Sequence, residues 1–409
     1  MQIETTRGNI YSYIRQTNEI VCGYKDDSDY NWNFEPLDMF TSMPEVNMFI
    51  ISITEQCNLR CRYCCYSGEY KNNRSHSYKH LTFNDIDDIY TYIERIVKDK
   101  SIRVAFYGGE PLLQFSLIQH AIIEGRRIWG DNIIFSISTN GTTLTLDRIE
   151  WLIKNEVELF ISIDGTRMYH DRNRVDASGN GSYSKVYETL SYIKNTHRNY
   201  LDNVSLQMTL SSYDDLDRIA EEWHNDPVLK DISPSNIHGL SPNFSLGVNK
   251  VVFDDVKTLY MNLLGLYERH SDWLVLKVFF EQTLAYWKNR PIVDAGESVP
   301  MATCMPVNTK LYIDTNLKIG VCEKVADNFR IGNVHNGIDW SLANDTVNRY
   351  YNKRKSRCRN CSAVRMCDMC LTALEYTDEQ WDILCHNERV YAKVFMTIFC
   401  EMAERGMLS

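Results

Sequence analysis

The sequence predicts an α/β fold built on a parallel sheet, and three observations lead to this class. Between about residues 47 and 290, short apolar runs of strand length alternate with longer amphipathic runs of helix length. The alternation repeats six times, and successive strand-then-helix units form parallel sheets with right-handed crossovers. A complete TIM-like barrel needs eight such units, so six units predict an open, partial (β/α)6 barrel.

The predicted elements follow one another in a regular order. Strands are expected at 47–54, 102–107, 132–138, 158–163 and 203–210, with a weaker one at 231–237. Helices are expected at 82–99, 112–129, 145–155, 182–198 and 214–225, followed by a longer helix near 253–288. Thr82 is the expected N-cap of the first helix, and Asp85 adds a negative charge to its first turn.

The segments on either side of this repeat have a different character. Residues 8–24, GNIYSYIRQTNEIVCGY, predict two short strands about a QTNE turn. Residues 376–406 have the apolar spacing of a helix that packs on the core. We therefore expect an N-terminal β segment (1–46), the partial barrel (47–290), a cysteine-rich domain (291–390) and a C-terminal helix (391–409).

Composition restricts the class of protein. The 409 residues are 44% hydrophobic, which supports a sizeable core, but no run approaches the roughly 18 apolar residues of a membrane span. The start lacks the pattern of a signal peptide, so 13 cysteines predict a reducing, cytoplasmic location in which clustered thiols bind metal. A net charge of −10 argues against nonspecific binding of nucleic acid.

A short cysteine motif follows the first predicted strand. Cys57, Cys61 and Cys64 are spaced C-x3-C-x2-C, and thiolates packed this tightly suit an iron–sulfur cluster. Three ligands would leave one iron of a [4Fe–4S] cluster free to bind something else. The alternative is a zinc site, which needs a fourth ligand that Cys65 or His76 could supply.

Polar and glycine residues follow the next strands, at the edge where parallel α/β folds build their active sites. Two glycines let a backbone approach a ligand closely, and a planar guanidinium suits a carboxylate. An Asn-Gly pair is also an ordinary turn, and an arginine in a polar loop is often simply a surface residue. The candidate site residues are Gly108, Gly109, Glu110, Ser138, Asn140, Ser162, Asp164, Arg174 and Gln207.

The cysteine loop, with Tyr63 just before its third cysteine, resembles the cluster loop of the radical SAM enzymes. The resemblance implies a partial barrel and an open iron that binds S-adenosylmethionine (SAM) through its amino and carboxylate groups. It also implies that an electron from the cluster cleaves SAM to methionine and a 5′-deoxyadenosyl radical. Cys57, Cys61 and Cys64 would then be the catalytic ligands, and Tyr63 a contact of the cofactor.

The strand-end residues are similar to the SAM-binding motifs of the same family. Gly108-Gly109-Glu110 resembles the GGE motif, which binds the methionine amino group, and the STNG segment with Ser138 and Asn140 resembles the one facing the ribose. The SIDG run followed by HD and an arginine is similar to the signature of the subgroup that modifies peptides and proteins. The resemblance implies SAM contacts at Ser162 and Asp164, a carboxylate contact at Arg174, and a cofactor or substrate contact at Gln207.

The C-terminal cysteines form a second motif. Their spacing, C-x2-C-x5-C-x2-C, has a shorter central gap than the roughly 12–20 residues of a zinc ribbon. With an upstream pair and one further cysteine, it resembles the seven-cysteine SPASM extension, which holds two auxiliary [4Fe–4S] clusters. The resemblance assigns Cys304, Cys322 and Cys370 to the nearer cluster. It assigns four others to the outer cluster, namely Cys358, Cys361, Cys367 and Cys385.

This tail departs from the family pattern in two places. Leu317 stands where a glycine is usual, and the last pair is spaced x2 where x3 is usual. Seven cysteines also leave one ligand missing, so the nearer site takes another residue or stays open, for example to a substrate thiolate. The basic run at 353–357 either offsets the charge of thiolate-bound clusters or forms a solvated face. Three cysteines remain outside the scheme: Cys22, Cys65 and Cys400, of which Cys400 is expected in a helical core.

The resemblance implies a SAM-dependent maturase of ribosomally made peptides. Its partners would be a precursor peptide with a leader and an electron donor such as flavodoxin or ferredoxin. Residues 66–76 look like those of maturases of cysteine-rich peptides, which favours a thioether crosslink from sulfur to carbon. The alternatives are carbon–carbon cyclophane formation, oxidation of a sulfatase residue to formylglycine, and a noncatalytic iron–sulfur electron carrier.

Overall fold

A parallel sheet runs through the computed structural model, which describes residues 1–27, 29–32, 46–69, 74–97, 101–240, 249–292, 294, 304, 307, 309–325 and 329–408. Six parallel strands lie in chain order, and each pairs with the next. They are β4 (Met48–Thr54), β5 (Ile102–Gly108), β6 (Ile133–Thr139), β7 (Glu158–Ser162), β8 (Val204–Leu210) and β9 (Pro234–Gly239). This order confirms the predicted α/β class.

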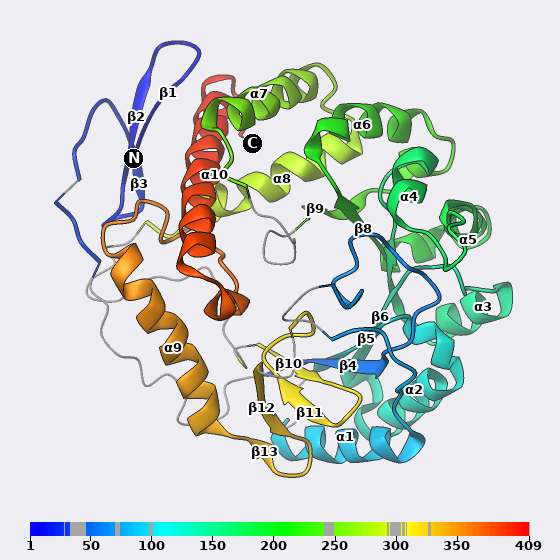
Figure 1. Ribbon diagram of the computed structural model, residues 1–409. Coiled ribbons are helices and arrows are strands. Elements are labelled where there is room, and N and C mark those ends of the chain that lie inside the picture. The colour runs from blue at the N-terminus through cyan, green and yellow to red at the C-terminus, as the bar shows by residue number, and fades with distance from the viewer. Residues whose placement is uncertain are drawn as a thin grey trace. The chain divides into compact units, whose positions relative to one another are not determined.

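The connecting helices lie on the outer side of this sheet (Figure 1). They are α1 (Phe83–Ile96), α2 (Phe115–Trp129), α3 (Leu146–Lys154), α4 (Arg167–Asn173), α5 (Tyr183–Thr196) and α6 (Leu216–Asn225). The expected cap of α1 is confirmed, because Thr82 and Asp85 form a capping box. The seven-residue α4 was not expected, since it is too short to show a helical period.

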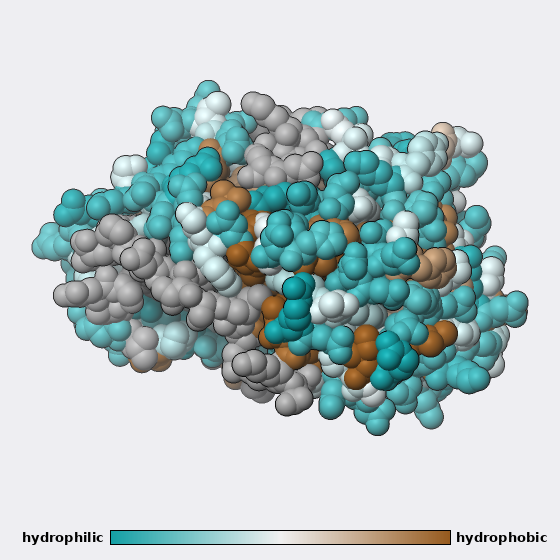
Figure 2. Space-filling model, turned by 90° about the horizontal axis from the view of Figure 1, so that it is seen from below, coloured by the Kyte–Doolittle hydropathy of each residue, from teal (hydrophilic) through white to brown (hydrophobic). Residues whose placement is uncertain are grey.

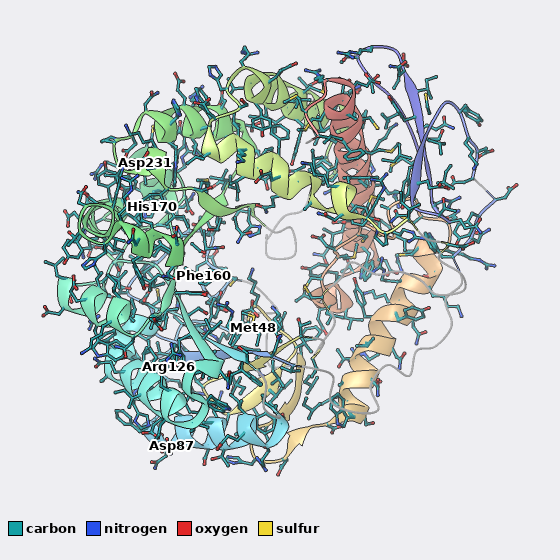
Figure 3. The ribbon with its side chains drawn as sticks, turned by 180° about the vertical axis from the view of Figure 1, so that it is seen from behind. Met48, Asp87, Arg126, Phe160, His170 and Asp231 are labelled. Atoms are coloured by element: carbon teal, nitrogen blue, oxygen red, sulfur yellow. The ribbon has the colours of Figure 1, made fainter. Side chains whose placement is uncertain are left out.

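The two faces of the strands differ in burial. Residues such as Phe106, Leu159 and Leu206 are fully buried against the helices. Most of their neighbours along the strands, which point to the opposite face, are only partly buried, although Ala105 is buried. Figure 3 shows Met48 and Phe160 on this inner face, whereas Asp87 lies outside among the helices. The inner face of the sheet therefore carries the side chains that a ligand could reach.

Four short strands extend the sheet beyond β4. The strand β10 (Lys310–Ile313) pairs with β4 in parallel, and three antiparallel strands follow it. These are β11 (Lys318–Gly320), β12 (Arg330–Asn333) and β13 (Gly337–Ile338). Strands of two to four residues give no readable alternation, which is why the sequence did not predict them. Among the described residues the sheet is open, with β9 and β13 at its edges.

The chain groups into two compact units. The sheet unit comprises residues Met39–Leu240 and Met305–Asn344, and the helical unit comprises Met1–Asp38, Ser241–Cys304 and Asp345–Ser409. The helical unit contains a three-stranded antiparallel sheet of β1 (Gln2–Glu4), β2 (Ile10–Ile14) and β3 (Glu19–Cys22). The two predicted N-terminal strands are confirmed as β2 and β3, and the three-residue β1 was missed.

The predicted single helix over 253–288 is wrong. The structure has α7 (Phe253–Arg269) and α8 (Leu274–Asn289), separated by a turn. Ser271 and Asp272 favour turns over helix interiors, and the His270 and Trp273 rings stack across the break with centroids 4.2 Å apart. The remaining helices are α9 (Trp340–Cys358) and α10 (Asp378–Glu404), which confirms the predicted C-terminal helix.

Hydrogen bonds attach the N-terminal strands to α10 within the helical unit. The buried Glu401 carboxylate accepts from the backbone N–H of Thr6 at 2.5 Å and from its hydroxyl at 2.8 Å. Glu404, one turn later, accepts from Asn9 and Tyr11, each at 2.9 Å. The N-terminal segment is therefore an integral part of this unit.

The surface seen in Figure 2 is mostly hydrophilic, with hydrophobic residues in small, separate groups. None of the described helices is both long enough and apolar enough to cross a membrane.

Candidate iron–sulfur site

Three thiols lie close together on the loop that follows β4. Each of Cys57, Cys61 and Cys64 is partly buried, and the three are near enough to affect one another's ionisation. Burial raises the pKa of Cys57 and of Cys64 to about 12, and it also raises the pKa of Cys61. The thiols are therefore protonated without metal, and a bound metal centre must displace those protons.

Backbone groups already point at two of the sulfur atoms. The N–H of Leu59 donates to Cys57 Sγ and the N–H of Tyr66 donates to Cys64 Sγ, each at 3.4 Å. Hydrogen bonds of this kind stabilise thiolate ligands and tune a cluster. The loop thus supplies the thiol ligands from its side chains and donors to two of them from its backbone.

The Gly108-Gly109-Glu110 segment holds the base of the cysteine loop. The N–H of Gly109 donates to Thr54 O and the N–H of Glu110 donates to Gln56 O, both at 2.8 Å. An added Cβ would lie 2.2 Å from Thr54 O at Gly108 and 2.3 Å from Gln56 O at Gly109. The close approach that explains these glycines is therefore to the main chain of the cysteine loop, and their contact with a ligand stays a prediction.

Glu110 joins the ends of β5 and β6. Its fully buried carboxylate accepts from the backbone N–H of Asn140 at 2.7 Å, from the Thr139 hydroxyl at 2.8 Å and from the N–H of Leu112 at 3.1 Å. Burial raises the pKa of Glu110 to about 7, although these three donors favour the ionised form.

Asn140 connects the end of β6 to the cysteine loop. Its Nδ2 donates to Asn58 Oδ1 at 2.9 Å and lies 3.8 Å from Cys57 Sγ. Its Oδ1 accepts from the Thr142 hydroxyl at 2.6 Å, and Thr142 accepts in turn from Asn58 at 2.8 Å. The sequence did not single out Asn58 or Thr142, because asparagine and threonine are ordinary in turns. A contact between Asn140 and a cofactor remains a prediction.

Asp164 and Arg174 form a buried ion pair on the other side of the loop. Arg174 Nε donates to Asp164 Oδ2 at 2.8 Å, the Tyr63 hydroxyl donates to the same oxygen, and the N–H of Thr209 donates to Oδ1 at 2.9 Å. Burial alone would lower the pKa of Arg174, but Asp164 reverses this and raises it above its usual value. The charge of Arg174 also acts on the Cys61 thiol, whose pKa it lowers against the effect of burial. The alternative interpretation, in which Arg174 is simply a surface residue, is wrong, since only 8% of Arg174 is exposed.

His170 supports this ion pair as a neutral imidazole. Its Nδ1 accepts from the N–H of Asp164 at 3.3 Å, and its Nε2 lies 2.9 Å from the hydroxyl of Ser182, which donates to Arg174 O. Burial, followed by the charge of Arg174, lowers the pKa of His170 to about 3. Figure 3 shows His170 on the side of the sheet that carries the helices. It positions Asp164 and Arg174.

The remaining predicted site residues lie on the inner face of the sheet. Ser138 is paired with Phe160, and Ser162 is in register with Gln207. Gln207 Oε1 accepts from Asn236 at 3.2 Å, whereas its Nε2 is buried without a hydrogen-bond partner in the described chain. Asn236 was missed because the strand that carries it was predicted only weakly. A ligand could reach these residues on the inner face of the sheet, but which of them bind one remains a prediction.

Arg74 tests whether an anionic cluster fits this site. Its Cζ lies 3.8 Å from the centroid of the Tyr66 ring, and within the described ranges its three guanidinium nitrogens are buried without a partner. Its charge acts on Cys64 and Cys65. Burying an unpaired charge costs free energy, so an anion is the missing partner, and a thiolate-bound cluster is anionic. The three thiols and the unpaired guanidinium of Arg74 both fit a [4Fe–4S] cluster.

The two residues considered for a zinc site also lie here. His76 Nε2 is 3.7 Å from Cys64 Sγ, and burial raises the pKa of the Cys65 thiol to about 11. Among the described residues, no three His, Cys, Asp or Glu side chains form a group that could hold a single metal ion. Residues 70–73 of the stretch at 66–76 lie outside the described residues.

Four of the C-terminal cysteines lie near one another in the helical unit, namely Cys358, Cys361, Cys367 and Cys385. Each of them is close enough to at least one of the other three for their charges to interact. Of the other predicted set, Cys322 belongs to the sheet unit, whereas Cys304 and Cys370 belong to the helical unit, so that set stays a prediction. Cys22 is exposed, and Cys400 is a buried core residue of α10, as expected.

We predict that Gly109→Ala prevents assembly of the site. The added Cβ would meet main-chain Gln56 O, so the cysteine loop cannot keep its position. Reconstituted protein should then bind about four iron atoms per chain fewer than wild type. Gly265→Ala is the matched control, because its Cβ would meet only the end of the Arg269 side chain at 3.6 Å. Full iron content in Gly109→Ala would contradict this account of the glycine.

We predict a pH dependence of stability that originates at Glu110. Its pKa in the folded chain is about 7 against an ordinary value of 4.5, so the fold binds a proton that the unfolded chain releases. The stabilising contribution is complete below about pH 4.5 and is lost as the pH rises through 7, by roughly 3 kcal/mol. Urea unfolding of metal-free protein should show a fall that is smaller by about this amount in Glu110→Gln than in wild type. The exposed Glu94→Gln should behave as wild type, and an identical profile in Glu110→Gln would exclude Glu110 as the source.

Comparison with known proteins identifies the domain that carries this site. Residues 51–221 match the family model of the Radical SAM superfamily. The chain is 23% identical over 342 residues to a cysteine-type anaerobic sulfatase-maturating enzyme of Clostridium novyi (strain NT), covering 80% of this chain and 87% of that one. It is also 23% identical over 351 residues to the radical SAM cyclopropyl synthase TigE of Paramaledivibacter caminithermalis, covering 81% and 69%.

Solved structures show the same fold. A structure described as "Native anSMEcpe with bound AdoMet" aligns with a TM-score of 0.61 at 18% identity, over 88% of this chain and 97% of the other. A second, "Native anSMEcpe with bound AdoMet and Cp18Cys peptide", aligns with a TM-score of 0.63 at 18% identity, over 88% and 98%. With the cysteine loop and strand-end network inside the matched range, the chain carries a radical SAM domain at residues 51–221.

Proposed function

We propose that this protein is a radical SAM peptide maturase that forms a thioether crosslink in a ribosomally made peptide. The observation that carries the proposal is the gathering of Cys57, Cys61 and Cys64 at a point where three strand-end segments, after β5, β6 and β7, hold their loop. An electron carrier would need the cysteines alone. It would have no use for the buried Glu110 and the Asp164–Arg174 pair beside them.

In this proposal the three cysteines hold a [4Fe–4S] cluster, and the strand ends bind SAM. The bound cluster and SAM together supply a 5′-deoxyadenosyl radical that abstracts hydrogen from an unactivated carbon. Gly108, Gly109 and Glu110 would face the methionine amino group. The Nε of Arg174 is committed to Asp164, so Arg174 would meet the cofactor carboxylate through its terminal nitrogens. The remaining proposed contacts are Tyr63, Ser138, Asn140, Ser162 and Gln207.

The C-terminal cysteines would hold two auxiliary clusters in a SPASM extension spanning about 291–390. Cys358, Cys361, Cys367 and Cys385 suit the outer one, which is supported by their proximity within the helical unit. Cys304, Cys322 and Cys370 would supply only three ligands to the nearer one. The fourth position would then be open to a thiolate of the substrate.

Such a position would explain the proposed bond. Joining a peptide thiol to a peptide carbon removes one hydrogen atom from the carbon and one proton from the sulfur. One electron is left over and passes to the auxiliary centre. A peptide substrate is supported by the Cp18Cys peptide named in the similar structure. The external electron donor would be a flavodoxin or a ferredoxin, as a reducing cytosol provides.

Formylglycine formation is the second candidate. It is favoured by the sulfatase-maturating relative, which aligns over 87% of its own length. The relationship to a cyclopropyl synthase shows that carbon–carbon bond formation also occurs among the relatives, so cyclophane formation stays a third candidate.

We predict that reduced, reconstituted protein binds about twelve iron atoms per chain and converts SAM to 5′-deoxyadenosine. Cys61→Ala should lose about four iron atoms and all 5′-deoxyadenosine above background, as measured by iron assay and liquid chromatography. Cys22→Ala is the control, because Cys22 is exposed and belongs to none of the proposed ligand sets. Wild-type protein that bound stoichiometric zinc, or that left SAM intact, would overturn the enzyme proposal.

The crosslink itself is tested on the precursor peptide encoded beside the enzyme. After reaction, mass spectrometry should find the loss of two hydrogens together with one cysteine that no longer reacts with iodoacetamide. A product that had lost two hydrogens with every cysteine still alkylated would favour a carbon–carbon bond. Conversion of a sulfatase cysteine or serine to an aldehyde would favour the second candidate.

A further inference from the structure

A single arginine stands out among the C-terminal cysteines. Arg354 lies on α9, one turn before Cys358, and only 1% of it is exposed. Its charge acts on Cys358 and Cys367, and it also acts on Cys385. Its Nη1 and Nη2 atoms are buried without any hydrogen-bond partner in the described part of the chain. A buried guanidinium with two free donors faces the outer cysteine set.

The rest of the basic run behaves differently. Lys353 donates to three backbone carbonyls, those of Ala373, Leu374 and Tyr376, at 2.8–3.2 Å. Arg357 forms an ion pair with Asp378 at 2.8 Å, and Lys355 is exposed. The basic run is therefore not a single solvated face, and it does not act as a whole to offset the charge of a cluster. Within the run, only Arg354 is buried beside the cysteines.

The acid nearest in effect forms no ion pair with Arg354 and is only partly ionised near neutral pH. Glu388 is the carboxyl group whose ionisation Arg354 affects, and burial, followed by Asp368, raises the pKa of Glu388 to about 7. Among the described residues, no carboxylate forms an ion pair with Arg354. In this respect it differs from the buried Arg174, which is paired with Asp164. A charge left this way in a buried position destabilises the fold unless an anion is present.

The N-terminal segment packs against the loop that carries part of the set. Trp32, of which 3% is exposed, donates its indole N–H to Cys361 O at 3.1 Å and its backbone N–H to Arg359 O at 2.7 Å. Arg15 donates to Asn360 O at 2.7 Å, and Arg365 donates to Gln16 O, also at 2.7 Å. The N-terminal segment thus covers the loop between Cys358 and Cys367. Because Arg354, Cys358 and Cys367 are buried, the fixed charge of Arg354 acts strongly on these two thiols.

We propose that Arg354 is the built-in counter-charge of the outer auxiliary cluster, a positioning residue that stabilises the cluster and raises its reduction potential. The inference rests on the proposed function, since it requires that a cluster binds at these four cysteines. A thiolate-bound cluster gains negative charge on reduction, so a neighbouring guanidinium favours the reduced form. The free Nη1 and Nη2 donors would hydrogen-bond to its sulfur atoms.

The test compares Arg354→Met, Arg354→Lys and Lys355→Gln in the full chain. In a redox titration followed by electron paramagnetic resonance, Arg354→Met should lower the reduced-to-oxidised ratio of one auxiliary cluster about tenfold at a fixed potential, or about 59 mV for a one-electron couple. Arg354→Lys keeps the charge and should fall between wild type and Arg354→Met. Lys355→Gln should match wild type, because Lys355 is exposed.

A second measurement separates this role from a merely structural one. In metal-free protein, replacing an unpaired buried charge by a methionine should leave the thermal midpoint unchanged or raise it, whereas the loaded protein should lose cluster faster. Equal destabilisation of both forms, or an unchanged potential in Arg354→Met, would overturn the inference alone. Wild-type protein with no auxiliary cluster signal would overturn the proposed function and this inference together.

Discussion

The site depends on how a short loop without secondary structure of its own is held in place. Neighbouring segments do this through main-chain hydrogen bonds. Thr54 and Gln56 accept from the glycine segment after β5, while the N–H groups of Arg60 and Arg62 donate to the chain at and just after the end of α4. Backbone groups have fixed geometry, so they orient three sulfur atoms more firmly than flexible side chains would. The positions of the three thiols therefore depend on these main-chain hydrogen bonds.

Charge is distributed unevenly through the molecule. The buried carboxylates of Glu110 and Asp164 each accept three hydrogen bonds from the protein. By contrast, Arg74 and Arg354 keep guanidinium nitrogens that are buried without partners among the described residues. Both lie beside groups of cysteines. The chain thus provides donors for these two buried acids and leaves two buried cations whose partners would be anions brought from outside.

The sequence allowed the parallel strands to be found because their apolar runs are long enough to show a pattern. It did not reveal β10 to β13, whose pairing depends on contacts distant in the chain. The cysteine loop and its polar neighbours were predicted as a group. The role of Gly109 in main-chain packing was not, because its approach to Gln56 exists only in the folded chain. Arg354 was hidden in a basic run. Arg354 is four residues from both Tyr350 and Cys358, so the three share one face of the helix. This spacing was the signal that could have distinguished Arg354 from the other basic residues of the run.

The parallel pairing of β4 with β10 has a consequence for synthesis. One edge of β4, the strand that leads into the cysteine loop, stays unpaired until residues 310–313 have been made. The ribosome therefore delivers the loop long before the strand that completes its sheet. Pairing between segments so far apart in the chain is slow, and an exposed edge is open to wrong partners in the meantime. The sheet around the cysteine loop can therefore be completed only after residues 310–313 have been made.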